Sequence, residues 1–237
     1  MPCRRLFSSV VAQMHTPGIT YTLGGGAYVQ LTERARGGTT LLRARGAGFA
    51  MPATSGFAPL ARHHPEREPL AEEVISALEA TFLAGYDTGS AASHEGDLKG
   101  VTFAGAGDPL AHAGSVDVLC EVARWLRHAR PGTPIGVSTL GLVEAEASPA
   151  LIARLREAGV ERASVLLNAS NPSEYKKRMR PDDGLGFGDV CSFIVNCNEA
   201  GIGTIATAVE SPKVKMAPIS ALATSLGADF KSRSYHP

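Results

Sequence analysis

The sequence has few cysteines, and their spacing excludes the commonest uses of that residue. Only four occur among 237 residues: Cys3, Cys120, Cys191 and Cys197. They form no Cys-x-x-Cys pair and no disulfide framework, so we expect a reducing, intracellular compartment. Cys191 and Cys197 lie on a predicted helix about 120° apart around its axis, so they do not share a face. We interpret both as small core side chains rather than as ligands.

The sequence also lacks an excess of charge of either sign and lacks long apolar runs. Lys+Arg and Asp+Glu number 23 each, so no net charge attracts the chain to nucleic acid or to an anionic membrane. No apolar run reaches the roughly 18 residues of a membrane span. We therefore expect neither a nucleic-acid nor a membrane partner. Hydrophobic residues make up 44% of the chain, which is enough to bury the core of one large α/β domain.

Acidic residues are absent from residues 1–32, where Arg4, Arg5 and Ser8 lie among apolar side chains. This composition is typical of an organelle transit peptide, and it also fits an ordinary flexible terminus. We predict that residues 1–18 are a flexible or cleavable segment and that residues 19–237 form the domain. The expected location is the cytoplasm, or an organelle if the segment is a transit peptide.

Strand and helix patterns alternate along the rest of the chain, after a hairpin broken by Gly24, Gly25 and Gly26. Such alternation predicts a parallel sheet with right-handed crossovers. Six strands are too few for an eight-stranded barrel. We therefore predict an incomplete (βα)6 parallel barrel, with an open doubly wound α/β sheet as the alternative. The predicted strands are 19–32, 100–105, 134–139, 163–168, 203–209 and 229–235, and the predicted helices are 70–83, 115–129, 149–158, 188–200 and 217–226.

The helix boundaries carry recognisable signals. Ser115 and Ser148 are expected as N-caps, and Gly159 follows the end of the second of these helices. The first helix has apolar residues four apart, which predicts one buried face. These residues are Leu70, Val74, Leu78 and Phe82.

Polar and glycine residues follow several predicted strands at their carboxyl ends, which meet at one edge of a parallel sheet. Gly105, Gly107 and Asp108 follow the second strand, Thr139 ends the third and Asn168 ends the fourth. Glycine lets a ligand approach the backbone, and Asp108 can accept a hydrogen bond from a cationic ligand group. The alternative is a set of tight turns in which Asp108 is a local cap. We predict that these five residues bind a small molecule.

Five segments of the chain form a set with a fixed order and spacing. They are ITYTLGGGAYVQLTERA at 19–35, GVTFAGAGDPL at 100–110, GVSTLGL at 136–142, SVLLNASNPSEYKKRMRP at 164–181 and LATSLGADFKSRSYHP at 222–237. Together they resemble segments of the radical S-adenosylmethionine (radical SAM) enzymes, and in particular of a bacterial group often found beside TatD-type nucleases. The resemblance covers residues 19–237 and implies the fold of those enzymes.

The sequence departs from this family at the motif that defines it. The resemblance implies Cys-x3-Cys-x2-Cys, but those positions hold Ala35, Thr39 and Leu42. A [4Fe–4S] cluster is held by cysteine thiolates, and a threonine hydroxyl is a hard, neutral donor that suits it poorly. In addition, Asp108 stands where the family has Glu, and Leu140 stands where it has Asn. We predict that the cluster is lost and that S-adenosylmethionine binds weakly.

Two functions follow as hypotheses. The first is a non-catalytic protein that binds a small molecule, S-adenosylmethionine included, or a protein partner. The basic run Lys176–Arg180 is then either an anion- or partner-binding surface or a solvated face. The second is an active enzyme, which either obtains its cluster in another way or uses Asp108, His112 and Glu210 as acids and bases.

Overall fold

The computed structural model describes residues 18–64, 66–87 and 99–237. Almost all of the predicted flexible segment 1–18 lies outside these residues, so the transit-peptide hypothesis stays a prediction. Among the described residues, no helix is long and apolar enough to cross a bilayer.

A single seven-stranded sheet forms the centre of the fold, and its strands lie in the order in which they occur in the sequence. The first two strands are an antiparallel hairpin that turns at Gly24 (φ 57°) and Gly25 (φ 82°), and the remaining pairs are parallel. The first and last strands are not hydrogen-bonded within the described residues, so the sheet stays open. The strands are β1 (Thr20–Leu23), β2 (Gly26–Val29), β3 (Val101–Phe103), β4 (Ile135–Thr139), β5 (Arg162–Leu166), β6 (Gly203–Val209) and β7 (Asp229–Arg233).

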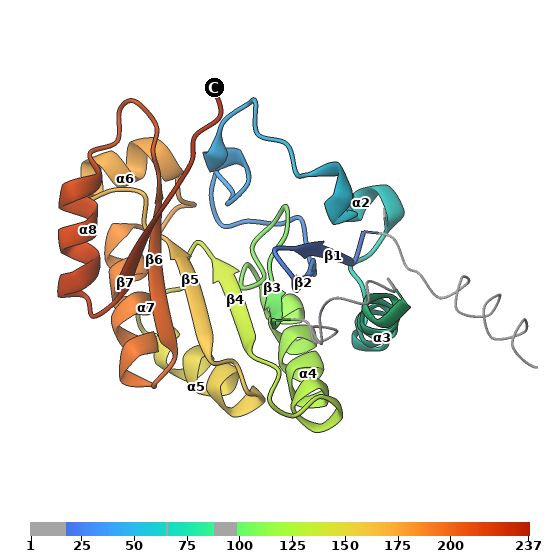
Figure 1. The fold of residues 1–237 in the computed structure, drawn as a ribbon. Coiled ribbons are helices and arrows are strands. Elements are labelled where there is room, and N and C mark those ends of the chain that lie inside the picture. The colour runs from blue at the N-terminus through green and yellow to red at the C-terminus, as the bar shows by residue number, and fades with distance from the viewer. Residues whose placement is uncertain (1–17, 65, 88–98) are drawn as a thin grey trace, which may run out of the picture.

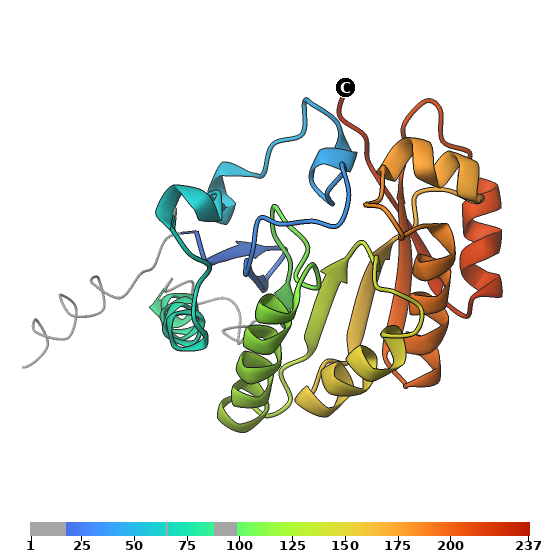
Figure 2. The same cartoon turned by 180° about the vertical axis from the view of Figure 1, so that it is seen from behind.

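The longer helices α3, α4, α5, α7 and α8 cover one face of this curved sheet, whereas α2 and α6 lie toward the strand ends (Figure 1 and Figure 2). Neighbouring helices pack in chain order, α3 against α4, α4 against α5 and α5 against α7. The helices are α2 (Leu60–His63), α3 (Ala71–Asp87), α4 (Ala113–Ala129), α5 (Ser148–Ala158), α6 (Pro172–Met179), α7 (Phe187–Glu199) and α8 (Met216–Ser225), with 3-10 turns η1 (Arg43–Arg45) and η2 (Ala53–Ser55).

The order of the strands decides between the two predicted architectures. In a doubly wound sheet the strand order reverses at a switch point and helices cover both faces. Here the order runs from β1 to β7 without reversal, with helices on one side (Figure 1). The doubly wound alternative is therefore wrong, and the incomplete barrel is confirmed.

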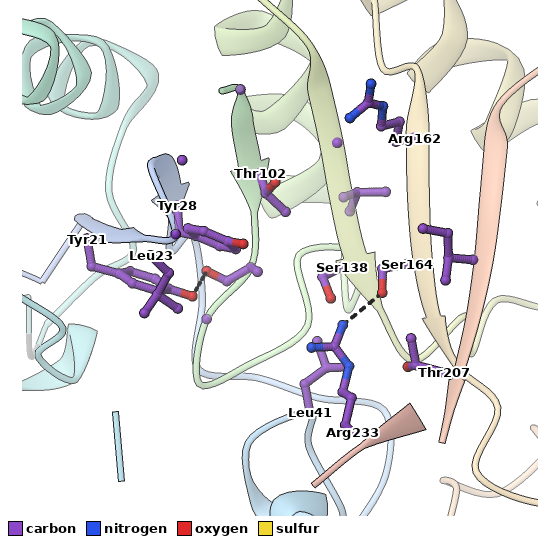
Figure 3. A pocket seen from close by; sticks show the side chains of 18 of the residues that line it. Tyr21, Leu23, Tyr28, Leu41, Thr102, Ser138, Arg162, Ser164, Thr207 and Arg233 are labelled. Atoms are coloured by element: carbon purple, nitrogen blue, oxygen red, sulfur yellow. Dashed lines mark hydrogen bonds between the residues drawn. The ribbon is translucent and has the colours of Figure 1, made fainter. Parts of the chain in front are cut away.

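Side chains alternate between the two faces of the strands, as extended backbone requires. Val101, Phe103 and Val165 are fully buried. Between them, Thr102 and Ser164 point to the concave face (Figure 3). The helix layer therefore covers the apolar core, while the concave face carries the polar side chains.

Both predicted N-caps, Ser115 and Ser148, are wrong. Ser115 is not the N-cap of α4, because His112 holds that position and its Nδ1 accepts the Ser115 N–H at 3.4 Å. Ser148 is the first residue of α5 rather than its cap, although Gly159 ends that helix at φ 103° as expected. Leu70 precedes α3 and is 46% exposed, so it is not part of the predicted buried face.

Candidate functional site

A cavity of about 570 Å³ occupies the concave face of the sheet. This volume lies in the range of small-molecule sites. Each of the seven strands contributes lining residues, and so does the loop after β2. One lining residue from each strand in turn is Tyr21, Tyr28, Thr102, Ser138, Ser164, Thr207 and Arg233.

One wall of the cavity is aromatic. The rings of Tyr21 and Tyr28 are stacked, with centroids 5.1 Å apart and planes 23° apart. The Tyr21 hydroxyl donates to the carbonyl oxygen of Ala104 at 3.3 Å, and burial raises the pKa of Tyr21. This side chain therefore stays neutral and fixed, so the wall is preformed. Figure 3 shows the two rings on one side of the cavity.

The side of the cavity away from the two rings is polar. Ser138 and Ser164 project from the adjacent strands β4 and β5, and the Arg233 guanidinium reaches toward them from β7 (Figure 3). Thr102, on β3, lies beside Tyr28. Nη2 of Arg233 donates to Oγ of Ser164 at 3.1 Å. The cavity thus offers hydroxyl groups and a guanidinium opposite an aromatic surface.

The loop after β2 is fixed to the segment that follows α6. Gly38 N–H donates to the Arg180 carbonyl at 2.8 Å, and Arg180 Nη2 donates back to the Gly38 carbonyl at 2.8 Å. Farther along the loop, Leu41, Leu42 and Phe49 line the cavity. The loop therefore has a defined position, in which its apolar side chains form part of the cavity lining.

The three positions that the sequence resemblance aligns with cluster cysteines make other contacts in the structure. Ala35 packs against the core, the Thr39 hydroxyl donates to the Arg178 carbonyl at 3.0 Å, and Leu42 lines the cavity. Within the described parts of the chain, no group of three or more His, Cys, Asp or Glu side chains is placed to hold a metal ion. The residues present at these positions do not fit an iron–sulfur cluster.

The three described cysteines lie in the helix layer. Cys120 is on α4, while Cys191 and Cys197 are on α7. Burial raises the pKa of all three thiols, that of Cys197 to about 12, so none is poised to ligate as a thiolate. The interpretation of Cys197 as a core residue is confirmed by its full burial, and Cys191 is partly buried against the same core.

Asp108 turns away from the cavity and joins two strand ends. Its carboxylate accepts the N–H groups of Leu110 at 2.9 Å and Leu140 at 2.8 Å, and the Thr139 hydroxyl at 2.8 Å. Burial raises the pKa of the Asp108 carboxyl, whereas these hydrogen bonds and Arg36 act in the opposite direction. The carboxylate and Thr139 are therefore engaged with each other rather than directed at a ligand.

The other predicted binding residues also have structural contacts. Gly105 alone of the five lines the cavity. A Cβ on Gly107 would lie 2.5 Å from the Arg34 carbonyl oxygen, so this glycine lets the loop after β2 approach. Asn168, at φ 52°, accepts the Val209 N–H at 3.0 Å and so joins the ends of β5 and β6. Four of the five predicted residues lie beside the cavity without lining it.

The three candidate acids and bases are not brought together. Nε2 of His112 lies 2.8 Å from Oε2 of Glu68, while its Nδ1 caps α4. Glu210 is exposed after β6, and neither it nor His112 lines the cavity. His112 and Glu210 are therefore not placed at the cavity, and Asp108 is engaged by the ends of two strands.

The basic run Lys176–Arg180 is divided between solvent and structure. Lys176 and Lys177 are exposed on α6. Arg178 donates to the Lys213 carbonyl, and Arg180 holds the loop after β2. The exposed part of the run, Lys176 and Lys177, is consistent with an ordinary polar helix face.

Comparison with known proteins identifies the fold. No family model matches this sequence, and no curated protein matches it at a significant level. The radical S-adenosylmethionine methyltransferase TsrM from Kitasatospora setae, with cobalamin and a [4Fe–4S] cluster bound, matches with a TM-score of 0.51 at 17% identity, over 86% of this chain and 34% of TsrM. SuiB from Streptococcus suis matches with a TM-score of 0.51 at 11% identity, over 73% of this chain and 35% of SuiB.

TsrM with a tryptophan substrate and an S-adenosylmethionine analogue also matches, with a TM-score of 0.50 at 17% identity, over 89% of this chain and 36% of TsrM. This chain thus spans about a third of the length of these proteins. At such identities the likeness shows that the chain has a radical SAM-like fold.

Proposed function

We propose that this protein is a non-catalytic relative of the radical SAM enzymes, which binds a small molecule in its concave cavity and holds no [4Fe–4S] cluster. One observation carries the proposal. The loop that would hold the cluster has Ala35, Thr39 and Leu42 in place of thiolates, and its Leu42 side chain lines the cavity instead. The same loop segment that would supply cluster ligands contributes binding surface.

S-adenosylmethionine is a weak candidate ligand under this proposal. Without iron, its amino and carboxylate groups lose their chelate, and the Asp108 carboxylate is already hydrogen-bonded to Thr139 and Leu140. We expect a Kd of about 0.1 mM or weaker, which corresponds to a binding free energy of at most about 5.5 kcal/mol in magnitude. Membership in the TatD-associated group, a protein partner and the compartment remain predictions.

The experiment compares wild-type protein with a variant whose cavity is filled. Ser138 points into the cavity and its hydroxyl has no hydrogen bond to a described residue, so Ser138→Phe places a ring there. After equilibrium dialysis against a small-molecule extract, mass spectrometry identifies the compounds that each protein enriches. Ser173→Phe, at an exposed position on α6, is the control.

We expect the wild type and Ser173→Phe to enrich a compound that Ser138→Phe does not. If all three proteins enrich the same compounds, or none does, the concave cavity is not a binding site. Circular dichroism establishes that the Ser138→Phe variant is folded.

A further inference from the structure

The charge of the cavity lining is unbalanced, although the whole chain is neutral. Five cationic side chains line the cavity and, in the part of the chain that the structure describes, no Asp or Glu does. None of the five forms a salt bridge with another described residue. The five are Arg45, Lys99, Arg162, Lys231 and Arg233.

Arg233 is the most enclosed of these cations. Its Nη2 bonds to Ser164, but its Nε is buried and has no hydrogen-bond partner among the described residues. Burial lowers the pKa of Arg233, and the nearby Arg45 guanidinium lowers it further. An enclosed charge without a counter-ion is costly unless a partner is supplied.

Arg45 is held near Arg233 by the residues that follow Arg233 in the sequence. Its guanidinium lies 4.2 Å from the centroid of the Phe49 ring, and its Nε donates to the Ser234 carbonyl at 3.0 Å. The His236 N–H donates to the Arg45 carbonyl at 2.7 Å. In Figure 1 the segment after β7 accordingly runs beside the 3-10 turn η1. Two guanidinium groups are thus fixed on one side of the cavity.

We propose that Arg45 and Arg233 bind the oxyanion, phosphate or carboxylate, of a small molecule whose planar part lies against the Tyr21–Tyr28 pair. The inference rests on the proposed function, since it names the chemistry of the cavity's ligand. Two adjacent guanidinium groups repel each other until an anion lies between them, and their forked donors match phosphate and carboxylate. The aromatic wall stands across the cavity from Arg233 (Figure 3), at a suitable place for a ring.

Calorimetry with matched pairs of probes tests the proposal at constant ionic strength. Adenosine 5′-monophosphate is compared with adenosine, and benzoate with benzamide, so each pair differs in the oxyanion. We expect at least one anion to bind at least about tenfold more tightly than its neutral counterpart, the effect of one charge-assisted hydrogen bond. The pair that shows the preference distinguishes a phosphate from a carboxylate ligand. If neither pair does, the proposal is overturned.

Single-residue variants then test whether Arg45 and Arg233 cause the preference for the anion. Arg233→Gln and Arg45→Gln should each weaken binding of the preferred anion about tenfold or more, while Arg156→Gln, at an exposed position on α5, should leave it unchanged. An anion that binds equally to all four proteins would place its site elsewhere. If a glutamine variant does not fold, Arg233→Lys keeps the charge and should retain the preference for the anion.

The two proposals fail differently. If dialysis shows that wild type enriches an uncharged or cationic compound that Ser138→Phe does not, the cavity binds small molecules but the oxyanion site is refuted. If the enriched compound carries a phosphate or carboxylate, both proposals stand, and the arginine variants should lose it.

Discussion

The hydroxyl of Thr139 lies 2.8 and 2.9 Å from the two carboxylate oxygens of Asp108 and donates its hydrogen bond to that carboxylate. The pair joins the end of β4 to the loop after β3. In this arrangement, Asp108 holds together the strand ends beside the cavity.

We expect Asp108→Asn to lower the free energy of unfolding by about 1–3 kcal/mol, because an amide keeps one acceptor oxygen and leaves one of the two buried N–H groups, of Leu110 or Leu140, without an acceptor. Chemical denaturation measures the change. Asp183→Asn, at an exposed position, should change stability by less than about 0.5 kcal/mol. Unchanged stability with lost ligand binding would show instead that Asp108 acts on the ligand.

His112 should matter for stability as the cap of α4. We expect His112→Ala to lower the free energy of unfolding by about 0.5–2 kcal/mol, because the Ser115 N–H loses its acceptor and Glu68 loses a partner. His128→Ala, exposed on the same helix, is the matched control and should have little effect. Equal stability of the two variants would refute the capping role.

The ion pair between Arg36, in the loop after β2, and Glu144 should make the free energy of unfolding depend on pH. The hydrogen bond that Arg36 donates to the Glu144 carboxylate lowers the pKa of Glu144 from 4.5 to about 2. Because the folded-state pKa is the lower one, the stabilisation is full above pH 4.5 and is lost as the pH falls toward 2. The pair is largely exposed, so we expect Arg36→Gln to cost only about 0.2–1 kcal/mol at neutral pH.

Urea unfolding of wild type and Arg36→Gln at about pH 7 and about pH 3 measures this effect. The difference between the two proteins should be smaller at the lower pH. A difference that is constant between the two pH values would mean that the ion pair is not its source.

Restoring the cysteines should restore the cluster. We expect the variant with Ala35→Cys, Thr39→Cys and Leu42→Cys to bind iron after anaerobic reconstitution, because three thiolates are what a cluster of this kind requires. Losing the Thr39 hydrogen bond to Arg178 and the Leu42 side chain should cost about 1–3 kcal/mol in the metal-free state. A folded triple variant that takes up no more iron than each double variant would mean that residues 35–42 are not a vacated cluster site.

The fold could be predicted from the sequence because its signals are local and repeated. Apolar strand segments alternate with amphipathic helices, and Gly24-Gly25 marks the hairpin. Helix α6 was not predicted, although Asn171 caps it and Pro172 begins it, both ordinary start signals. The basic residues that follow were interpreted only as a surface.

The site could be predicted only in part, because sequence spacing does not fix the direction of a side chain. The sequence indicates that Asp108 follows β3, but it does not indicate that the Asp108 carboxylate accepts the Thr139 hydroxyl. Polar residues within apolar strands, such as Thr102 and Ser164, were a readable signal for the concave face. No signal in the sequence indicates that Arg45 lies near Arg233, because this proximity depends on the curvature of the sheet and on chain segments far apart in sequence.

The central claim, a radical SAM-like fold without its cluster, is tested most directly by the iron content of the wild-type protein after anaerobic reconstitution with iron and sulfide. With Ala35, Thr39 and Leu42 at the cluster positions, we expect a colourless protein with well under one iron per chain, roughly the background level. About four irons per chain, with a broad absorbance near roughly 400 nm, is the signature of a [4Fe–4S] cluster. That result would contradict the claim.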